Sequence, residues 1–428
     1  MARRWSSSTR ACGLPEPSPP ATWERSPARI TEVLFLAALV AGFGQFGAVA
    51  SLNDVARHFG HHSAGQTFQS VVGLSGSVLG LGLAVLRLSS LGALPLTSLA
   101  DRWGRTRVLQ RTLALGLLFT ATASLSPSYW FFVLCFAFAR PLLSAASTLV
   151  QVVTVELSST RRRIHRLVVM AAGAGIGAGL SAVLHGVIRG PGSFRWLFAL
   201  AIVPVLFVVP LLRHIPEPTH LRDEVPLAHL GAVPRRFRGR LAIVAVMAFT
   251  VGMITGPANG FAFVYGEGVL KISPHYVATI VALSAFTGLA GLLASRRLAH
   301  TIGRRATVAL GVVATALTST FAYSGGRLAF TIGYMVGVAA AGLLAPAATA
   351  MSTEIFPHSF RATAAGWTVV AGVLGATAGL FLFGWVGDVV HGASVTSLRA
   401  PALVTFLPML PTLLLLARLP ESRSMELS

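Results

Sequence analysis

The chain has 428 residues, of which 54% are hydrophobic and only 11% charged, and its mean hydropathy is +0.71. A water-soluble domain could not cover so much apolar surface with polar side chains, which excludes a soluble globular protein. The formal net charge of +20 does not indicate a nucleic-acid partner, because the basic residues lie between apolar stretches and form no stripe with aromatic side chains.

Twelve apolar segments follow an N-terminal stretch, residues 1–29, that is rich in arginine, serine and proline and is expected to be a disordered cytoplasmic tail. Backbone amides in lipid need internal partners, and the segments lack the two-residue alternation of a β-barrel, so we expect an all-α membrane protein. The predicted spans are residues 31–52, 66–99, 108–125, 128–155, 167–188, 194–212, 241–264, 274–294, 306–323, 328–352, 362–387 and 400–417. They predict a first six-helix bundle at 30–213, a cytoplasmic linker at 214–240, a second bundle at 241–418 and a cytoplasmic tail at 419–428.

The basic residues are distributed unevenly among the connections between these spans. If the N-terminal tail is inside, 26 of the 34 lysine and arginine residues lie in inside segments, six lie in outside segments, and Arg87 and Arg140 lie within spans. Basic loops are retained on the cytoplasmic side of a membrane. We therefore expect a multi-pass protein of the bacterial inner (plasma) membrane, embedded in the lipid bilayer, with both termini in the cytoplasm.

The two halves of the chain contain matching sequences at matching positions. Leu-Ala-Asp-Arg-Trp-Gly-Arg at 99–105 closes the second span, and Leu-Ala-His-Thr-Ile-Gly-Arg at 298–304 closes the eighth, 199 residues later. Glu156 ends the fourth span and Glu354 ends the tenth, 198 residues later. This repeat predicts two pseudo-symmetric six-helix bundles, an arrangement typical of transporters that bind their solute between the repeats.

With Thr106 and Arg107 after it, the segment 99–105 resembles the Gly-x-Leu-Ala-Asp-Arg-x-Gly-Arg-Arg signature of the major facilitator superfamily. The chain departs from the signature at Thr97, where the family has a glycine, and at Thr106, where a basic residue is common. Residues 353–363 resemble the corresponding loop of the sugar and metabolite porters of that superfamily. The resemblance covers the chain after its tail and implies a monomeric secondary transporter that is driven by protons and uses no cofactor.

The same resemblance implies a conformational latch at the ends of the spans. A carboxylate held by arginines and a helix N-terminus is stable in one arrangement of the bundles and is released in the other. An alternative is that the arginines only anchor the topology, although this does not explain the acidic residues, which contribute little to topology. The latch residues implied are Asp101, Arg105 and Arg107, with Glu156, Arg163, Glu354 and Arg361 as further candidates.

Arg87 and Arg140 are cations within apolar spans, and such residues are functional candidates because their burial in lipid costs several kcal/mol. Arg87 lies 14 residues before Asp101 and Arg140 lies 16 before Glu156, which places both about 21 to 24 Å from the cytoplasmic edge at ~1.5 Å per residue. Three interpretations stay open: attraction of an anionic solute, tuning of a proton-carrying acid, and donation to backbone carbonyls. Arg140 also matches the arginine of a fourth-helix motif of proton-coupled drug exporters, whose following glutamine and glycine are absent here.

In this superfamily the first, fourth, seventh and tenth helices line the central cavity, so the resemblance implies Gln45, Arg140, Asn259 and Tyr265 as polar residues that contact solute. The alternative for each is an ordinary hydrogen bond to a neighbouring helix. No acidic residue lies deep in a span, so the proton carrier stays open among Glu32, Asp54, Glu267 and Asp388, which lie near span ends.

The run Gly173–Gly179 does not indicate a phosphate-binding loop, because it lies inside an apolar span without a preceding strand or a lysine. Glycines four residues apart, Gly173 with Gly177 and Gly175 with Gly179, instead predict close contact with another helix. The chain has two cysteines, no Walker lysine and no His-Glu-x-x-His, so we expect no enzyme, no cofactor and no metal site.

The function expected is secondary active transport of a small metabolite or organic anion, by alternating access and coupled to protons. Three alternatives stay open: drug efflux by proton antiport, a non-transporting membrane sensor or scaffold with the same fold, and a channel, which saturable exchange kinetics would exclude. The loop at 353–363 and the two arginines within spans favour the metabolite or organic anion. The fifth span lacks the Gly-Pro of the drug exporters, which weakens the case for efflux.

Overall fold

The computed structural model describes residues 27–60, 67–158, 162–188, 192–217, 235–390 and 397–419. Most of the two predicted tails and of the linker at 214–240 lies outside the described residues, as do the side chains of Glu354 and Arg361. In the described part, twelve helical stretches are long and apolar enough to cross a membrane, and no strand occurs. This confirms the prediction of an all-α membrane protein with twelve spans.

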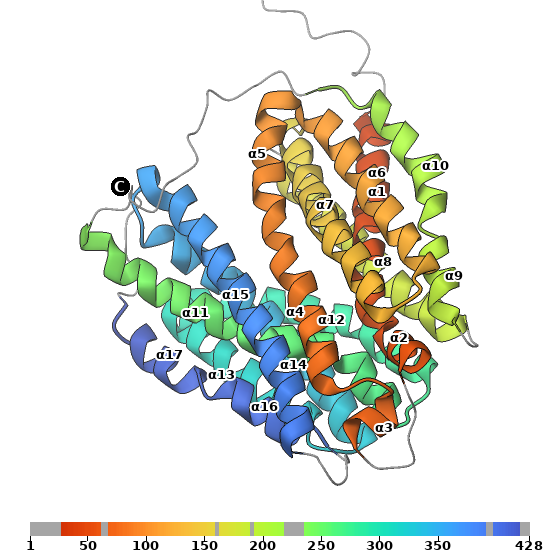
Figure 1. Ribbon diagram of the computed structural model, residues 1–428. Coiled ribbons are helices and arrows are strands. Elements are labelled where there is room, and N and C mark those ends of the chain that lie inside the picture. The colour runs from red at the N-terminus through yellow and green to blue at the C-terminus, as the bar shows by residue number, and fades with distance from the viewer. Residues whose placement is uncertain are drawn as a thin grey trace, which may run out of the picture.

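The first six spans form one bundle, coloured red to lime in Figure 1. Several spans are built from consecutive short helices. The helices are α1 (Pro27–Ala50), α2 (Leu52–Phe59), α3 (Phe68–Val72), α4 (Gly76–Ser89), η1 (Ser90–Gly92), α5 (Ala93–Trp103), α6 (Arg105–Thr122), η2 (Ala123–Leu125), α7 (Tyr129–Glu156), α8 (Arg163–Val187), α9 (Ser193–Ala199), α10 (Ile202–Leu211) and η3 (Leu212–His214).

The last six spans form the second bundle, coloured green to blue in Figure 1. A short π-helix, η5, lies between its first two spans. The helices are α11 (Arg235–Gly260), η5 (Val264–Val269), α12 (Pro274–Thr301), α13 (Arg304–Ala322), α14 (Arg327–Glu354), α15 (His358–Val390), α16 (Arg399–Phe406) and α17 (Met409–Leu416).

The repeat seen in the sequence has a local structural cause at two glycines. Gly104 separates α5 from α6 with φ of 95°, and Gly303 separates α12 from α13 with φ of 94°. A side chain disfavours this left-handed conformation, so glycine permits the chain to end one helix and start the next immediately. The two positions are 199 residues apart, which is the offset of the sequence repeat.

Glycines also determine how closely the first and fifth spans of each bundle approach. A Cβ at Gly177 of α8 would collide with the carbonyl oxygen of Leu39 on α1, and a Cβ at Gly375 of α15 would collide with that of Phe249 on α11. Gly173 likewise lies against α1, which confirms the predicted role of the first glycine pair. A Cβ at either glycine of the second pair, Gly175 and Gly179, would meet no atom within 4 Å, so that pair makes no close contact.

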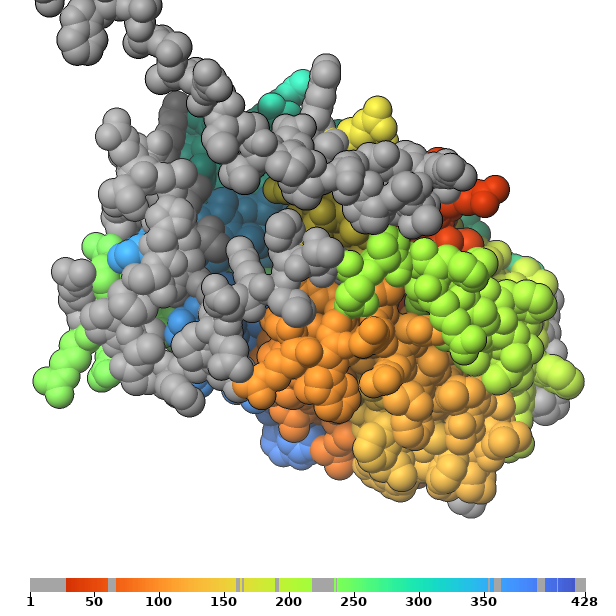
Figure 2. All heavy atoms as spheres, turned by 90° about the horizontal axis from the view of Figure 1, so that it is seen from above, coloured from red at the N-terminus to blue at the C-terminus, as the bar shows by residue number. Residues whose placement is uncertain are grey.

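The two bundles meet at one end of the molecule and stand apart at the other. We name the end where α1 starts and α17 ends the termini end, and the end that carries α2, α3 and η5 the far end (Figure 1). Across the bundles α4 packs against α15 and α8 against α12. Figure 2 views the termini end from above and shows lime α10 beside the orange and gold helices of the first bundle.

Candidate substrate cavity and gates

A cavity of 380 Å³ lies between the two bundles, and spans from both bundles line it. This volume is near the lower end of the range for ligand pockets, about 300 to 1,000 Å³. The lining residues include Gln45, Phe46, Arg87, Arg140, Ala174, Thr255, Asn259 and Leu380. The structure therefore brings together at one cavity four of the five residues that the sequence nominated for substrate or coupling.

Gln45 and Arg140 form one hydrogen-bonded group on the wall of the first bundle. Arg140 Nη1 donates to the backbone oxygen of Gln45 at 2.8 Å. The Gln45 side-chain amide donates to Ser147 Oγ at 2.8 Å and accepts from Ser144 Oγ at 3.4 Å. These contacts hold both side chains in defined orientations, which is what a binding site requires of the residues that contact its ligand.

The two arginines of the cavity carry positive charge that no carboxylate of the described residues compensates. Among the described residues, neither Arg87 nor Arg140 forms a salt bridge with an acidic side chain. The Nε atom of each is buried and has no hydrogen-bond partner in the described part of the chain. Buried charges are normally paired, so two guanidinium groups at one cavity without a carboxylate partner among the described residues suit a negatively charged ligand.

The opposite wall, from the second bundle, is polar but uncharged. Asn259 donates to the Thr255 backbone oxygen at 2.9 Å and accepts from the Tyr334 hydroxyl at 3.5 Å. A smaller cavity of 110 Å³ adjoins this wall, and Ser319 and Tyr323 also line it. The site is therefore asymmetric, with cationic groups on the first bundle and hydroxyl and amide groups on the second.

Tyr265 does not line this cavity, which corrects its place among the nominated residues. It is fully buried in η5 at the far end, where its ring lies 4.8 Å from that of Tyr323 and 5.9 Å from that of Phe330. Burial raises the pKa of Tyr265 to about 12. The physical reason for the difference is that α11 ends at Gly260, so the chain after it leaves the cavity wall.

At the termini end, Arg105 joins two of the nominated acidic residues. Its guanidinium is 2.9 Å from Asp101 and also pairs with Glu156. Arg105 is buried, whereas the Asp101 side chain is 52% exposed. These ion pairs lie entirely within the first bundle. Asp101 also lines a second, wider cavity of 1110 Å³, and Trp367 of α15 in the second bundle lines the same cavity.

The remaining latch candidates are placed less closely together. Arg163 lines the same wide cavity as Glu156, and Arg107 is exposed on α6. The structure adds one acidic residue that the sequence analysis did not nominate for this role. Glu217 accepts a hydrogen bond from the Thr106 backbone N–H at 3.1 Å and so caps the N-terminus of α6. Its position in a Pro-Glu pair just after the sixth span was the only signal in the sequence.

At the far end, hydrogen bonds between the bundles close the molecule. The Asp388 carboxylate of α15 accepts from the backbone N–H groups of Gly76 and Ser77 at 2.7 and 2.8 Å, and from the Ser77 hydroxyl. An acidic side chain from the second bundle therefore caps the N-terminus of α4 in the first. We call this contact the Asp388 cap.

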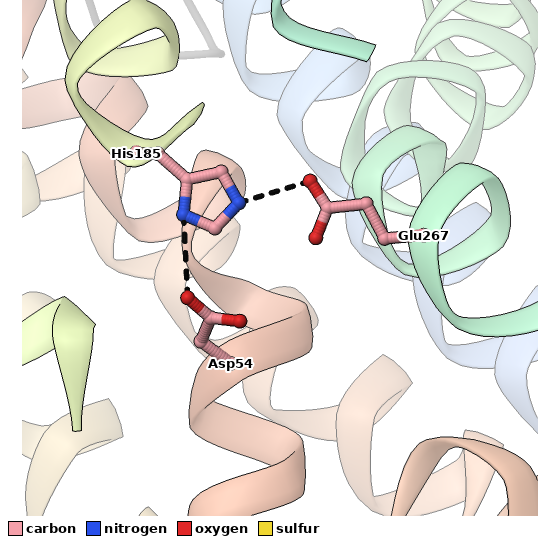
Figure 3. A group of neighbouring side chains, drawn as sticks. All are labelled: Asp54, His185 and Glu267. Atoms are coloured by element: carbon pink, nitrogen blue, oxygen red, sulfur yellow. Dashed lines mark hydrogen bonds and ion pairs between the residues drawn. The ribbon is translucent and has the colours of Figure 1, made fainter. Parts of the chain in front are cut away.

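A second contact between the bundles at the far end is a group of three ionisable side chains, of which His185 and Glu267 are buried and Asp54 is partly exposed (Figure 3). His185 Nε2 lies 2.9 Å from Glu267, and His185 Nδ1 lies 3.5 Å from Asp54. Asn53 donates to the other Glu267 oxygen at 3.1 Å, and Ser193 donates to Asp54 at 2.6 Å. Sequence reasoning noted both acids but not His185, although a histidine inside an apolar window was a visible signal.

Comparison with known proteins identifies the family. Residues 34–270 match the model of the Major Facilitator Superfamily. The chain belongs to this superfamily. Within the superfamily it is 24% identical over 307 residues to the probable 4-methylmuconolactone transporter of Cupriavidus pinatubonensis, covering 68% of this chain and 71% of the relative. It is 25% identical over 366 residues to the cis,cis-muconate transport protein of Acinetobacter baylyi, covering 80% of this chain and 83% of the relative.

Solved structures of the superfamily share the fold. An inward-open xylose transporter from E. coli superposes with a TM-score of 0.71 at 15% identity, covering 93% of this chain and 97% of that one. An inward-facing bacterial homolog of the human lysosomal transporter Spinster superposes with a TM-score of 0.70 at 13% identity, covering 91% and 96%. The predicted membership of the major facilitator superfamily is confirmed, and the protein is a multi-pass membrane transporter.

Proposed function

We propose that this transporter carries a small organic anion, whose acidic group binds Arg87 and Arg140 in the central cavity. The observation that supports this most is the pair of guanidinium groups without a carboxylate partner among the described residues. A cationic drug would be repelled by the same charges, because a cavity of low dielectric constant weakens electrostatic forces far less than water does. The two sequence relatives, one named for 4-methylmuconolactone and the other for cis,cis-muconate, support the same chemical class.

The neutral wall of the cavity supports an asymmetric solute. With the acidic group at the arginines, the other end of the solute reaches Asn259 and the adjoining pocket with Ser319 and Tyr323. Amide and hydroxyl groups suit a carbonyl, ester or hydroxyl oxygen at that end. The solute class is therefore a compact organic acid that carries a second, uncharged polar group.

The termini end is proposed to face the cytoplasm, because most of the basic residues belong to connections at that end. The wide cavity at that end then opens to the cytoplasm, while the Asp388 cap closes the external side. In the opposite state the termini end closes, and Asp101 is proposed to reach the N-terminal part of α15 across the wide cavity. Proton coupling is proposed as the driving force, because an anion otherwise enters the cell against a negative-inside potential.

Counterflow in proteoliposomes tests the solute class. Purified protein is loaded with an unlabelled organic acid, and uptake of the labelled acid is compared with uptake of labelled organic cations. Saturable counterflow of the acids is expected, with loss of counterflow in the R87Q/R140Q double variant and wild-type counterflow in Arg111→Gln, an exposed arginine of α6. Counterflow of cations but not of acids would contradict the proposal.

A further inference from the structure

The far end is closed by a histidine that lies between two carboxylates from different bundles. His185 is in the last turn of α8, Asp54 is in α2 of the same bundle, and Glu267 is in η5 of the second bundle (Figure 3). His185 and Glu267 are buried, with side-chain exposures of 2% and 3%. The ring of Phe263 makes an edge-to-face contact with the imidazole at a centroid distance of 5.6 Å.

The number of protons on the imidazole determines whether this contact is attractive on both sides. Each ring nitrogen of His185 faces a different carboxylate. A neutral imidazole has one N–H, so its second nitrogen would direct a lone pair at a carboxylate oxygen. An imidazolium donates to both Asp54 and Glu267, and it reduces the net charge of the group from −2 to −1.

Glu267 is the member of the group that separates when the far end opens. Both of its oxygens are bonded to the first bundle, one to His185 and the other to Asn53. Of the carboxylates in the described residues, opening therefore leaves His185 only Asp54. Two carboxylates stabilise the imidazolium when the far end is closed, and one does so when it is open. The closed state therefore binds the proton more tightly, and by linkage proton binding favours closure.

We infer that His185 is a proton-binding site that locks the external gate: a proton bound between Asp54 and Glu267 holds the far end closed. The inference rests on the proposed function for the assignment of the far end to the external side. Closure of the gate takes up one proton, and opening releases it. External acidity thus favours the state that opens toward the cytoplasm.

Neighbouring ionisable groups contact other partners or lie at the surface. Arg195 of α9 donates to the Ser126 backbone oxygen at 3.2 Å and lies 3.4 Å from His58. His275 of α12, which packs near Gly186, is exposed. Among the described residues, the ion pairs of His185 are those with Asp54 and Glu267.

A proton fits this geometry better than a metal ion does. The ligand atoms of the three residues lie within 4.8 Å of one another, a spacing that a metal ion could bridge. A single ion would need one ring nitrogen and both carboxylates to converge on one point. Here the carboxylates lie at different ring nitrogens, each at hydrogen-bonding or ion-pairing distance from its own nitrogen.

Opening of the far end is tested by double electron–electron resonance, which measures the distance between two spin labels. Spin labels are placed on Arg57→Cys in α2 and Arg399→Cys in α16, both exposed, after replacement of the native cysteines by Cys12→Ser and Cys135→Ala. The full-length protein is studied in lipid nanodiscs without solute or gradient over a pH series. The long-distance population is expected to rise with pH by at most about tenfold per pH unit, which is the limit for the exchange of one proton.

Two variants should remove this pH dependence and two should retain it. His185→Gln and Glu267→Gln each eliminate the charged pair, so their distance distributions should not change with pH. Asp388→Asn weakens the Asp388 cap and should enlarge the open population at every pH while the pH dependence remains. His165→Gln, on the exposed opposite end of α8, should behave as wild type.

Persistence of the wild-type pH dependence in both His185→Gln and Glu267→Gln would overturn the inference. A pH-independent wild-type gate would overturn it as well. Loss of closure on addition of EDTA at constant pH, with recovery on adding zinc, would identify a metal site in place of a proton site. Counterflow of organic acids is measured separately, so failure of the gate proposal and failure of the transport proposal give different results.

Discussion

Replacing Arg140 by glutamine is expected to weaken binding of the organic anion by about ten- to hundredfold. Arg140 contributes one of the two guanidinium groups of the central cavity that have no carboxylate partner among the described residues, and its buried Nε makes no hydrogen bond to those residues. A hydrogen bond to a charged group contributes about 1.5 to 3 kcal/mol. Since about 1.4 kcal/mol corresponds to a factor of ten in affinity, the loss of one such bond gives this range, while Arg87 retains part of the attraction.

The assay is equilibrium binding of the acid identified by counterflow, measured by calorimetry on purified protein at constant ionic strength. Arg111→Gln is the matched control, because it makes the same change of charge at an exposed position outside the cavity. Thermal unfolding is recorded for each variant. Arg140 also donates to the Gln45 backbone oxygen, so some loss of stability is expected alongside the loss of affinity.

An unchanged affinity in Arg140→Gln, together with a lower unfolding temperature, would refute the reasoning. Arg140 would then be a structural donor to Gln45 and not a ligand for the solute. A similar loss of affinity in Arg111→Gln would show that net charge, and not the position of the guanidinium group, determines binding.

Three further outcomes are expected. Asp101→Asn should slow counterflow severalfold with a stability change below about 1 kcal/mol, because the side chain is half exposed; a wild-type rate would exclude Asp101 from the latch. Gly177→Leu should greatly reduce the yield of folded protein, because its side chain would collide with α1, whereas Gly175→Leu, with open space around it, should unfold at the wild-type temperature; equal yields would contradict the packing. In spheroplasts that express the protein without its native cysteines, a membrane-impermeant maleimide should label Arg399→Cys and not Trp103→Cys, and the reverse pattern would invert the proposed orientation.

The fold could be predicted from the sequence because lipid imposes a local requirement. Each span must be a continuous apolar helix that satisfies its own backbone, so hydropathy alone identifies it. The repeat could also be recognised from the sequence, because the same sharp change of direction between two helices requires a glycine at both Gly104 and Gly303. Arg87 and Arg140 were recognisable for the same local reason, as a cation inside an apolar window is conspicuous without any knowledge of its neighbours.

The partners of each side chain depended on the tertiary structure. Gly175 and Gly177 are alike in the sequence, but at about 100° per residue they point to nearly opposite sides of α8, and only the packing of α1 distinguishes them. His185 meets Glu267 from 82 residues away and across two bundles, whereas the neighbouring Tyr265 turns into the core of the second bundle. Hydropathy determines that a segment crosses the membrane; the rotation and tilt of that helix, and therefore which charges meet, depend on contacts with distant segments.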